Sequence, residues 1–64
     1  MDTRDMVVEV VYDAPNGLIL MDIGEAVNKR YHTPLSTRDV EQIIDKNPKL
    51  FTEENGKIKC PNNF

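Results

Sequence analysis

The stretch that decides the fold is LSTRDVEQIIDKNPKLFTEENGKIKC, residues 35–60. Ser36 stands directly before a run of helical apolar periodicity, and Asp39 follows three residues later, which is the spacing of a capping box at a helix start. Pro48 forces the residue before it out of helical geometry, so the pattern predicts a helix over residues 36–47. The apolar side chains expected to face the core are Val40, Ile43 and Ile44.

A β-hairpin is predicted after this helix, over residues 50–60. Asn55-Gly56 is the strongest two-residue hairpin signal, because a type I′ turn needs positive φ at both central residues. Centring the turn there places an opposite-charge pair of residues beside it. The pairs that follow from this register are Phe51 with Cys60, Thr52 with Lys59, Glu53 with Ile58 and Glu54 with Lys57.

A further helix is predicted to begin at Asp22. Asp22 and Glu25 have capping-box spacing, and both carboxylates would face the positive end of the helix macrodipole. Lys29 and Arg30 fall in the last turn, where cations are favoured. The apolar residues 18–20, which follow a Pro-Asn-Gly turn, are too few for a helix and predict a brief strand.

The first segment, residues 2–13, fits two structures. Its apolar residues make one helical stripe with carboxylates opposite, and Asp2 is placed to cap the N-terminus. Residues 6–12 are also rich in β-branched side chains, so they fit a strand that pairs with the hairpin in a small α+β sheet. We favour the helix because the charges leave a single apolar stripe. That stripe comprises Met6, Val7, Val10, Val11 and Ala14, and the carboxylates are Asp5, Glu9 and Asp13.

The composition indicates one domain over residues 1–64. The chain has 64 residues, 39% of them hydrophobic and 30% charged, which suits a small folded domain. A single cysteine, Cys60, excludes an internal disulfide and a Cys-based zinc cluster. No apolar run approaches the roughly 18 residues of a membrane span, so no membrane partner is expected. The unpaired thiol and the lack of a leader segment favour an intracellular protein.

No catalytic or metal-binding constellation is evident in the sequence. His32 is the only histidine, and it has no Cys/His partners with the spacing of a transition-metal site. Cys60 falls in the inward register of the last predicted strand and behaves there as a small hydrophobe. We therefore expect a non-catalytic protein with no metal and no small-molecule cofactor.

The predicted order is helix, short strand, helix, helix and β-hairpin, and in this it resembles a winged helix over nearly the whole chain. The segment from Asn16-Gly17-Leu18 through Asn47-Pro48-Lys49-Leu50-Phe51 is also distantly similar to the compact LOTUS type of winged helix. In that type a Gly-apolar-apolar start precedes a helix, and a turn containing proline precedes the hairpin. The link before Ser36 is short for LOTUS domains. The resemblance implies an α+β fold, with a three-helix core and a C-terminal β-hairpin wing.

The winged-helix resemblance implies binding of nucleic acid, with DNA favoured over RNA by analogy of fold. In such proteins the third helix enters the major groove and the wing touches the backbone. Arg38 would then suit a guanine edge, Gln42 an adenine edge and the lysines phosphate. Glu41 and Asp45 lie on or beside the same face and would repel phosphate. The residues implicated are Thr37, Arg38, Gln42, Lys46, Lys49, Lys57 and Lys59.

The charge distribution keeps a second function open. The net charge of −3 argues against a strong sequence-independent grip on nucleic acid. Residues 1–28 carry a net charge of −5, whereas residues 29–64 carry +2. The acidic first helix would suit a protein-interaction module within a larger assembly. The residues expected to bind such a protein partner are Asp5, Val8, Glu9 and Tyr12.

Overall fold

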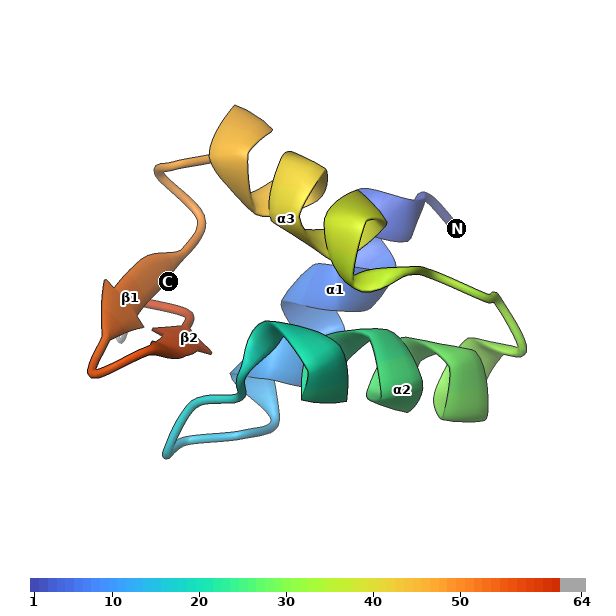
Figure 1. Ribbon diagram of the computed structural model, residues 1–64, viewed down its shortest axis with the longest axis horizontal. Helices are drawn as coiled ribbons and strands as arrows, with labels where there is room; N and C mark the ends of the chain where they lie inside the picture. The colour runs from blue at the N-terminus through green and yellow to red at the C-terminus, as the bar shows by residue number, and fades with distance from the viewer. Residues whose placement is uncertain (62–64) are drawn as a thin grey trace.

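The computed structural model describes residues 1–61 and shows an α+β domain of three helices followed by an antiparallel hairpin (Figure 1). This confirms the predicted helices and hairpin, in the predicted order. None of the helices in residues 1–61 has the length and apolar character that crossing a membrane requires. The elements are α1 (Thr3–Tyr12), α2 (Leu20–Tyr31), α3 (Thr37–Lys46), β1 (Thr52–Glu54) and β2 (Lys57–Lys59).

Helix α2 is the centre of the packing, because it contacts both α1 and α3. Helix α1 runs behind the other two helices in Figure 1, and the hairpin lies at the end of the bundle where α1 turns into α2. Strand β2 reaches α1 and also meets the α1–α2 loop. The three helices and the hairpin therefore surround one apolar core.

The core combines side chains from every helix and from the hairpin. The helix expected over residues 2–13 is confirmed, and the alternative strand over residues 6–12 is wrong. Burial of three valines on one helical stripe outweighs the helix-propensity cost of β-branched residues, which is only about 0.7 kcal/mol each. Asp2 is the N-cap residue by its backbone, but its side chain makes no capping hydrogen bond. The buried side chains are Val7, Val10, Val11, Ile23, Val27, Val40, Phe51 and Ile58.

The capping box that opens α3 is confirmed. The Asp39 amide donates to Ser36 Oγ at 3.1 Å, and the Ser36 amide donates to Asp39 Oδ2 at 3.1 Å. The helix ends at the C-cap residue Asn47, before Pro48, as predicted. Val40 is fully buried, and the other two residues of its apolar stripe are half-buried. The inward face of α3 is therefore the predicted one.

The hairpin has the predicted register over its three pairs, from Thr52 with Lys59 to Glu54 with Lys57. Both turn residues have positive φ, 55° at Asn55 and 79° at Gly56. The pair of Phe51 with Cys60 falls outside the ladder. The predicted opposite-charge pair beside the turn, Glu54 with Lys57, does not form the ion pair of the hairpin. Lys59 Nζ instead contacts Glu54 Oε1 at 2.8 Å, diagonally across the strands.

The predictions for residues 18–20 and for Asp22 are wrong. Helix α2 begins at Leu20, its N-cap residue Ile19 has no side-chain capping bond, and Asp22 lies inside the first turn. The expected strand is reduced to a bridge at Leu18, whose amide and carbonyl both bond with Ile58, at 3.0 and 2.8 Å. The two hydrogen bonds of Leu18 connect the α1–α2 loop to the hairpin. Helix α2 then begins two residues later, at Leu20.

Candidate nucleic-acid interface

The position of α3 is set by a close approach to α2 at Gly24. A Cβ atom at this buried glycine would lie 2.9 Å from the carbonyl oxygen of Leu35, in the segment that leads into α3. Any side chain would therefore push that segment away, since a backbone atom has little room to move. The sequence pattern placed Gly24 in a helix start and missed this role. A glycine inside a helical pattern was the available signal.

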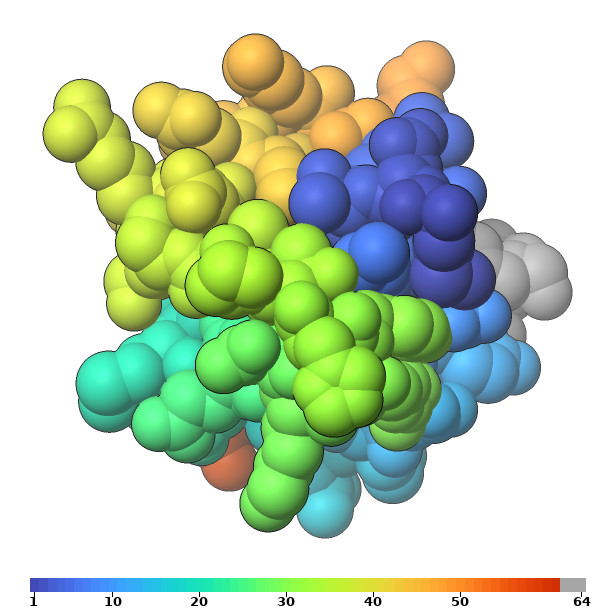
Figure 2. Space-filling model, turned by 90° about the vertical axis from the view of Figure 1, so that its right-hand side faces the viewer, coloured from blue at the N-terminus to red at the C-terminus, as the bar shows by residue number. Residues whose placement is uncertain are grey.

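The outward face of α3 carries Arg38 and Gln42. With roughly 3.6 residues per turn, these two residues and Asp45 lie opposite the buried Val40, and all three are exposed. Figure 2 shows side chains of the first half of α3, in yellow, standing out from the surface at the upper left. Within residues 1–61, neither Arg38 nor Gln42 takes part in a side-chain hydrogen bond or an ion pair. Both side chains are available to a ligand.

The charges along α3 are mixed. The helix contains the cations Arg38 and Lys46 and the carboxylates Asp39, Glu41 and Asp45, for a net charge of −1. Such a surface offers little attraction to phosphate as such. The exposed candidates near the ends of the helix are Thr37, Lys46 and Lys49.

The hairpin lysines Lys57 and Lys59 lie against the α1–α2 loop at Gly17. Gly17, with φ +84°, allows the α1–α2 loop to lie close to these two side chains. A Cβ atom at this position would be 2.9 Å from Lys57 Cβ and 3.0 Å from Lys59 Cγ. Lys59 also lines a hollow beside Tyr12 at the end of α1. The hydrogen bond from Lys59 lowers the pKa of Glu54. The structure thus does not bring Lys59 together with the outward residues of α3.

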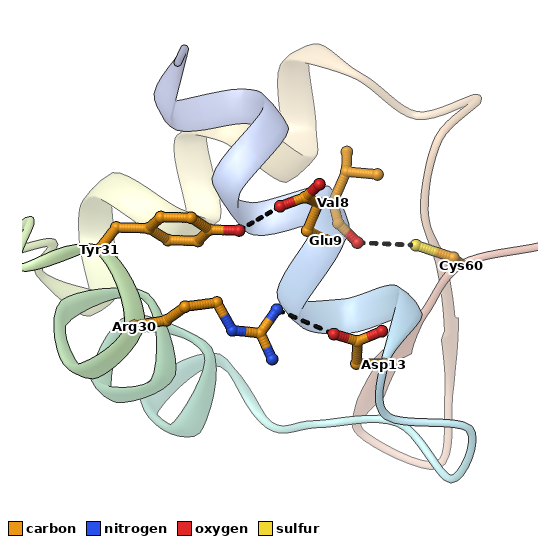
Figure 3. A network of polar contacts seen from close by, with 6 residues as sticks. All are labelled: Val8, Glu9, Asp13, Arg30, Tyr31 and Cys60. Atoms are coloured by element: carbon orange, nitrogen blue, oxygen red, sulfur yellow. Dashed lines mark hydrogen bonds and ion pairs between the residues drawn. The ribbon is translucent and has the colours of Figure 1, made fainter.

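The acidic face of α1 is engaged by the end of α2 (Figure 3). The Tyr31 hydroxyl donates to Glu9 Oε2, and the Arg30 guanidinium contacts Asp13 Oδ2 at 2.8 Å. The bond with Glu9 raises the pKa of Tyr31. Hydrogen bonding with Tyr31, and then with Asp13, raises the pKa of Arg30. The sequence pattern gave no sign of either contact, because each joins residues far apart in the chain.

The other residues of the alternative protein-binding site are unevenly exposed. Val8 is half-buried, and its carbonyl accepts a weak 3.6 Å bond from Cys60 Sγ; burial raises the pKa of that thiol. Asp5 is half-buried beside Arg4, at 3.5 Å. Tyr12 is 63% exposed. Of the two apolar residues expected to bind a partner, only Tyr12 is therefore largely exposed.

Two further results bear on function. Among residues 1–61, no group of three or more His, Cys, Asp and Glu side chains is placed to hold a metal ion. No family model, curated protein or solved structure matches this chain.

Proposed function

We propose that this chain is a winged-helix module that binds duplex DNA through the outward face of α3. The order of three helices and a hairpin supports this assignment, and the bridge between Leu18 and Ile58 stands where such a fold has its first strand. The observation that carries the proposal is the exposed pair Arg38 and Gln42, which is free of side-chain partners within residues 1–61.

The chemistry of this pair suits the major groove. An arginine binds guanine O6 and N7, and a glutamine binds adenine N6 and N7; each good pair contributes about 1–3 kcal/mol of discrimination. Exposed lysines at the C-terminal end of α3 and on the hairpin suit phosphate. These are Lys46, Lys49 and Lys57, whereas Lys59 is already paired with Glu54.

A protein partner on the acidic first helix is the alternative, and the contacts of that helix make it the weaker one. Of the carboxylates expected to bind a partner, Glu9 already bonds with Tyr31 and Asp5 contacts Arg4. Asp13, on the same acidic face, bonds with Arg30. The bonds of Glu9 and Asp13 reduce the negative charge that the two carboxylates offer to a basic partner. The outward pair on α3 has no such bonds within residues 1–61.

The test is fluorescence anisotropy with labelled duplex DNA at about 50 mM salt, followed by a salt titration. We expect the affinity to fall with a log–log slope of about −0.9 for each phosphate contacted. The double variant Arg38→Ala/Gln42→Ala should remove most of the binding. No affinity for any duplex would overturn the proposal, and binding that survives the double variant would move the site to another face.

A pair of exposed lysines supplies a matched control. Lys49 follows α3, whereas Lys29 lies in the last turn of α2. We expect Lys49→Ala to reduce the salt slope by about 1, because one phosphate contact is lost. Lys29→Ala should leave the slope unchanged. Equal losses in the two variants would indicate a diffuse electrostatic attraction in place of a defined surface.

A further inference from the structure

A groove between α2 and the start of α3 plays no part in the proposed function. It has a volume of about 510 Å³. One wall is formed by α2, and the other by the α2–α3 link with the first turn of α3. The buried Gly24 lines it where α2 approaches Leu35 most closely. In Figure 1 the link lies at the opposite end of the molecule from the hairpin, so the groove is separate from the hairpin lysines.

The groove exposes apolar surface. Met21, in the first turn of α2, is 57% exposed and lines it. On the other wall Pro34 is exposed and Leu35 is half-buried. A methionine side chain is unbranched and flexible, so it adapts to the shape of a ligand. These side chains can therefore cover an apolar residue of a partner.

The charged residues that line the groove, within residues 1–61, are the two carboxylates Glu25 and Asp39. Glu25 is exposed and takes part in no side-chain hydrogen bond or ion pair in that range. Asp39 accepts a bond from the Ser36 amide, which is neutral and leaves the charge of the carboxylate in place. Lys29, one turn beyond Glu25, does not line the groove. A basic ligand would therefore complement its charge.

The link between the helices also offers backbone groups. In the described part of the chain, neither the Pro34 carbonyl nor the Leu35 amide takes part in a hydrogen bond. One is an acceptor and the other a donor, and both belong to residues that line the groove. An extended peptide bonds to such groups as a strand does when it adds to an open edge. An extended ligand therefore suits this wall.

We infer that the groove binds an extended, basic segment of another protein. The segment places an apolar side chain against Met21 and a lysine or arginine beside Glu25, and its backbone bonds with the link. A second copy of this chain is a poorer occupant, because its net charge of −3 is of the same sign as the groove. The two carboxylates would repel duplex DNA. This binding is therefore independent of the DNA binding proposed for the outward face of α3.

The experiment measures binding of the full chain to an array of labelled extended peptides, each of which combines an apolar residue with lysines or arginines. A matched array has glutamate in place of each basic residue. We expect binding to basic members alone. Titration of the chain with the best basic peptide, followed by nuclear magnetic resonance, should shift the amide signals of Met21, Glu25 and Leu35 more than those of β1.

Single substitutions test the two parts of the groove. Glu25→Gln should weaken binding of that basic peptide about 2- to 5-fold, because one exposed charge pair is lost. Met21→Ser should weaken it about 5-fold, because the apolar side chain of the peptide loses its cover. The control is Glu53→Gln, which removes the same charge from an exposed position on the hairpin and should leave the affinity unchanged. Circular dichroism of each variant checks that the fold is retained.

The outcomes separate this inference from the proposed function. Equal binding to the basic and acidic arrays, or binding to neither, would overturn the inference. Amide shifts confined to α1 or to the outward face of α3 would overturn it as well. Self-association of the chain that Glu25→Gln reduces would identify a second copy as the occupant in place of a basic partner. Each of these results leaves the DNA-binding proposal standing, because Glu25→Gln does not alter the outward face of α3.

Discussion

The outward faces of α1 and α3 look alike in the sequence and differ in the structure. Each helix buries an apolar stripe and turns charged side chains to the other side. On α1, Glu9 and Asp13 bond with the end of α2. The polar face of α1 therefore bonds with a neighbouring helix. The polar residues Arg38 and Gln42 of α3 have no such bonds within residues 1–61.

The difference originates in what α2 presents to each neighbour. Toward α1 it extends Tyr31 and Arg30, whose long polar side chains reach across to carboxylates. Toward α3 it presents Gly24, which has no side chain and allows close backbone approach. The first contact pairs carboxylates of the α1 face with α2. On α3, Arg38, Glu41 and Asp45 have no side-chain hydrogen bond or ion pair within residues 1–61. The availability of a polar face therefore depends on the neighbouring helix as well as on its own sequence.

The largest effect on the free energy of unfolding is expected from Gly24→Val, which adds a side chain where α2 approaches the segment leading into α3. Its Cβ would be 2.9 Å from the Leu35 carbonyl oxygen. Overpacking of this kind costs about 1–3 kcal/mol of unfolding free energy, a large share of the stability of so small a domain. Urea unfolding followed by circular dichroism measures the loss. Glu25→Val, at the next and exposed position, should cost only the helix-propensity difference of about 0.7 kcal/mol or less. Equal losses would mean that Gly24 makes no close contact.

A comparison of two arginines separates the two faces directly. Arg38→Ala should weaken binding to duplex DNA by about 5- to 150-fold while leaving the unfolding midpoint unchanged, because its exposed side chain has no hydrogen bond or ion pair within residues 1–61. Arg30→Ala should do the reverse, with a lower midpoint and unchanged binding, since it removes the contact with Asp13. Fluorescence anisotropy gives the affinity of each variant for DNA, and thermal unfolding gives the midpoint of each. An Arg30 variant that loses as much binding as the Arg38 variant would contradict the comparison.

A smaller difference is expected between the two hairpin lysines. Lys57→Ala should lower the salt slope by about 0.9, the value of one phosphate contact. Lys59→Ala should leave the slope nearly unchanged, because Lys59 is held by Glu54 and faces the end of α1. Salt titrations of the two variants against the same duplex make the measurement. Equal slopes in both variants would mean that the ion pair opens when DNA binds.

The parts of the fold that could be predicted from the sequence are those whose physics is local. The capping box of Ser36 with Asp39 acts within one helical turn, and the Asn55-Gly56 turn fixes the hairpin register by its own φ angles. The start of α2 was missed because it depends on the bridge from Leu18 to a distant strand. A local pattern carries no signal of that pairing.

The candidate site divides in the same way. The winged-helix resemblance implicated Arg38 and Gln42 on the third helix, and the structure has both exposed. It could not show that Glu9 bonds with Tyr31, 22 residues away, or that Lys59 turns to Glu54. These contacts decide which charges remain available to a ligand, and they depend on how the elements pack.

The smallest effect is a pH dependence confined to the α1 face. The bond with Glu9 raises the pKa of Tyr31 above its ordinary value of 10.0. A raised pKa means that the stabilising contribution is fully present below the ordinary pKa and is lost as the pH rises through the folded value. Tyrosinate absorbance in a Tyr12→Phe background should therefore show a midpoint above 10.0, which Glu9→Ala moves down. DNA binding at neutral pH should be the same in both proteins. If Glu9→Ala leaves the titration midpoint of Tyr31 unchanged, the hydrogen bond between Tyr31 and Glu9 does not form in solution, and the contact between α1 and α2 at this face is wrong.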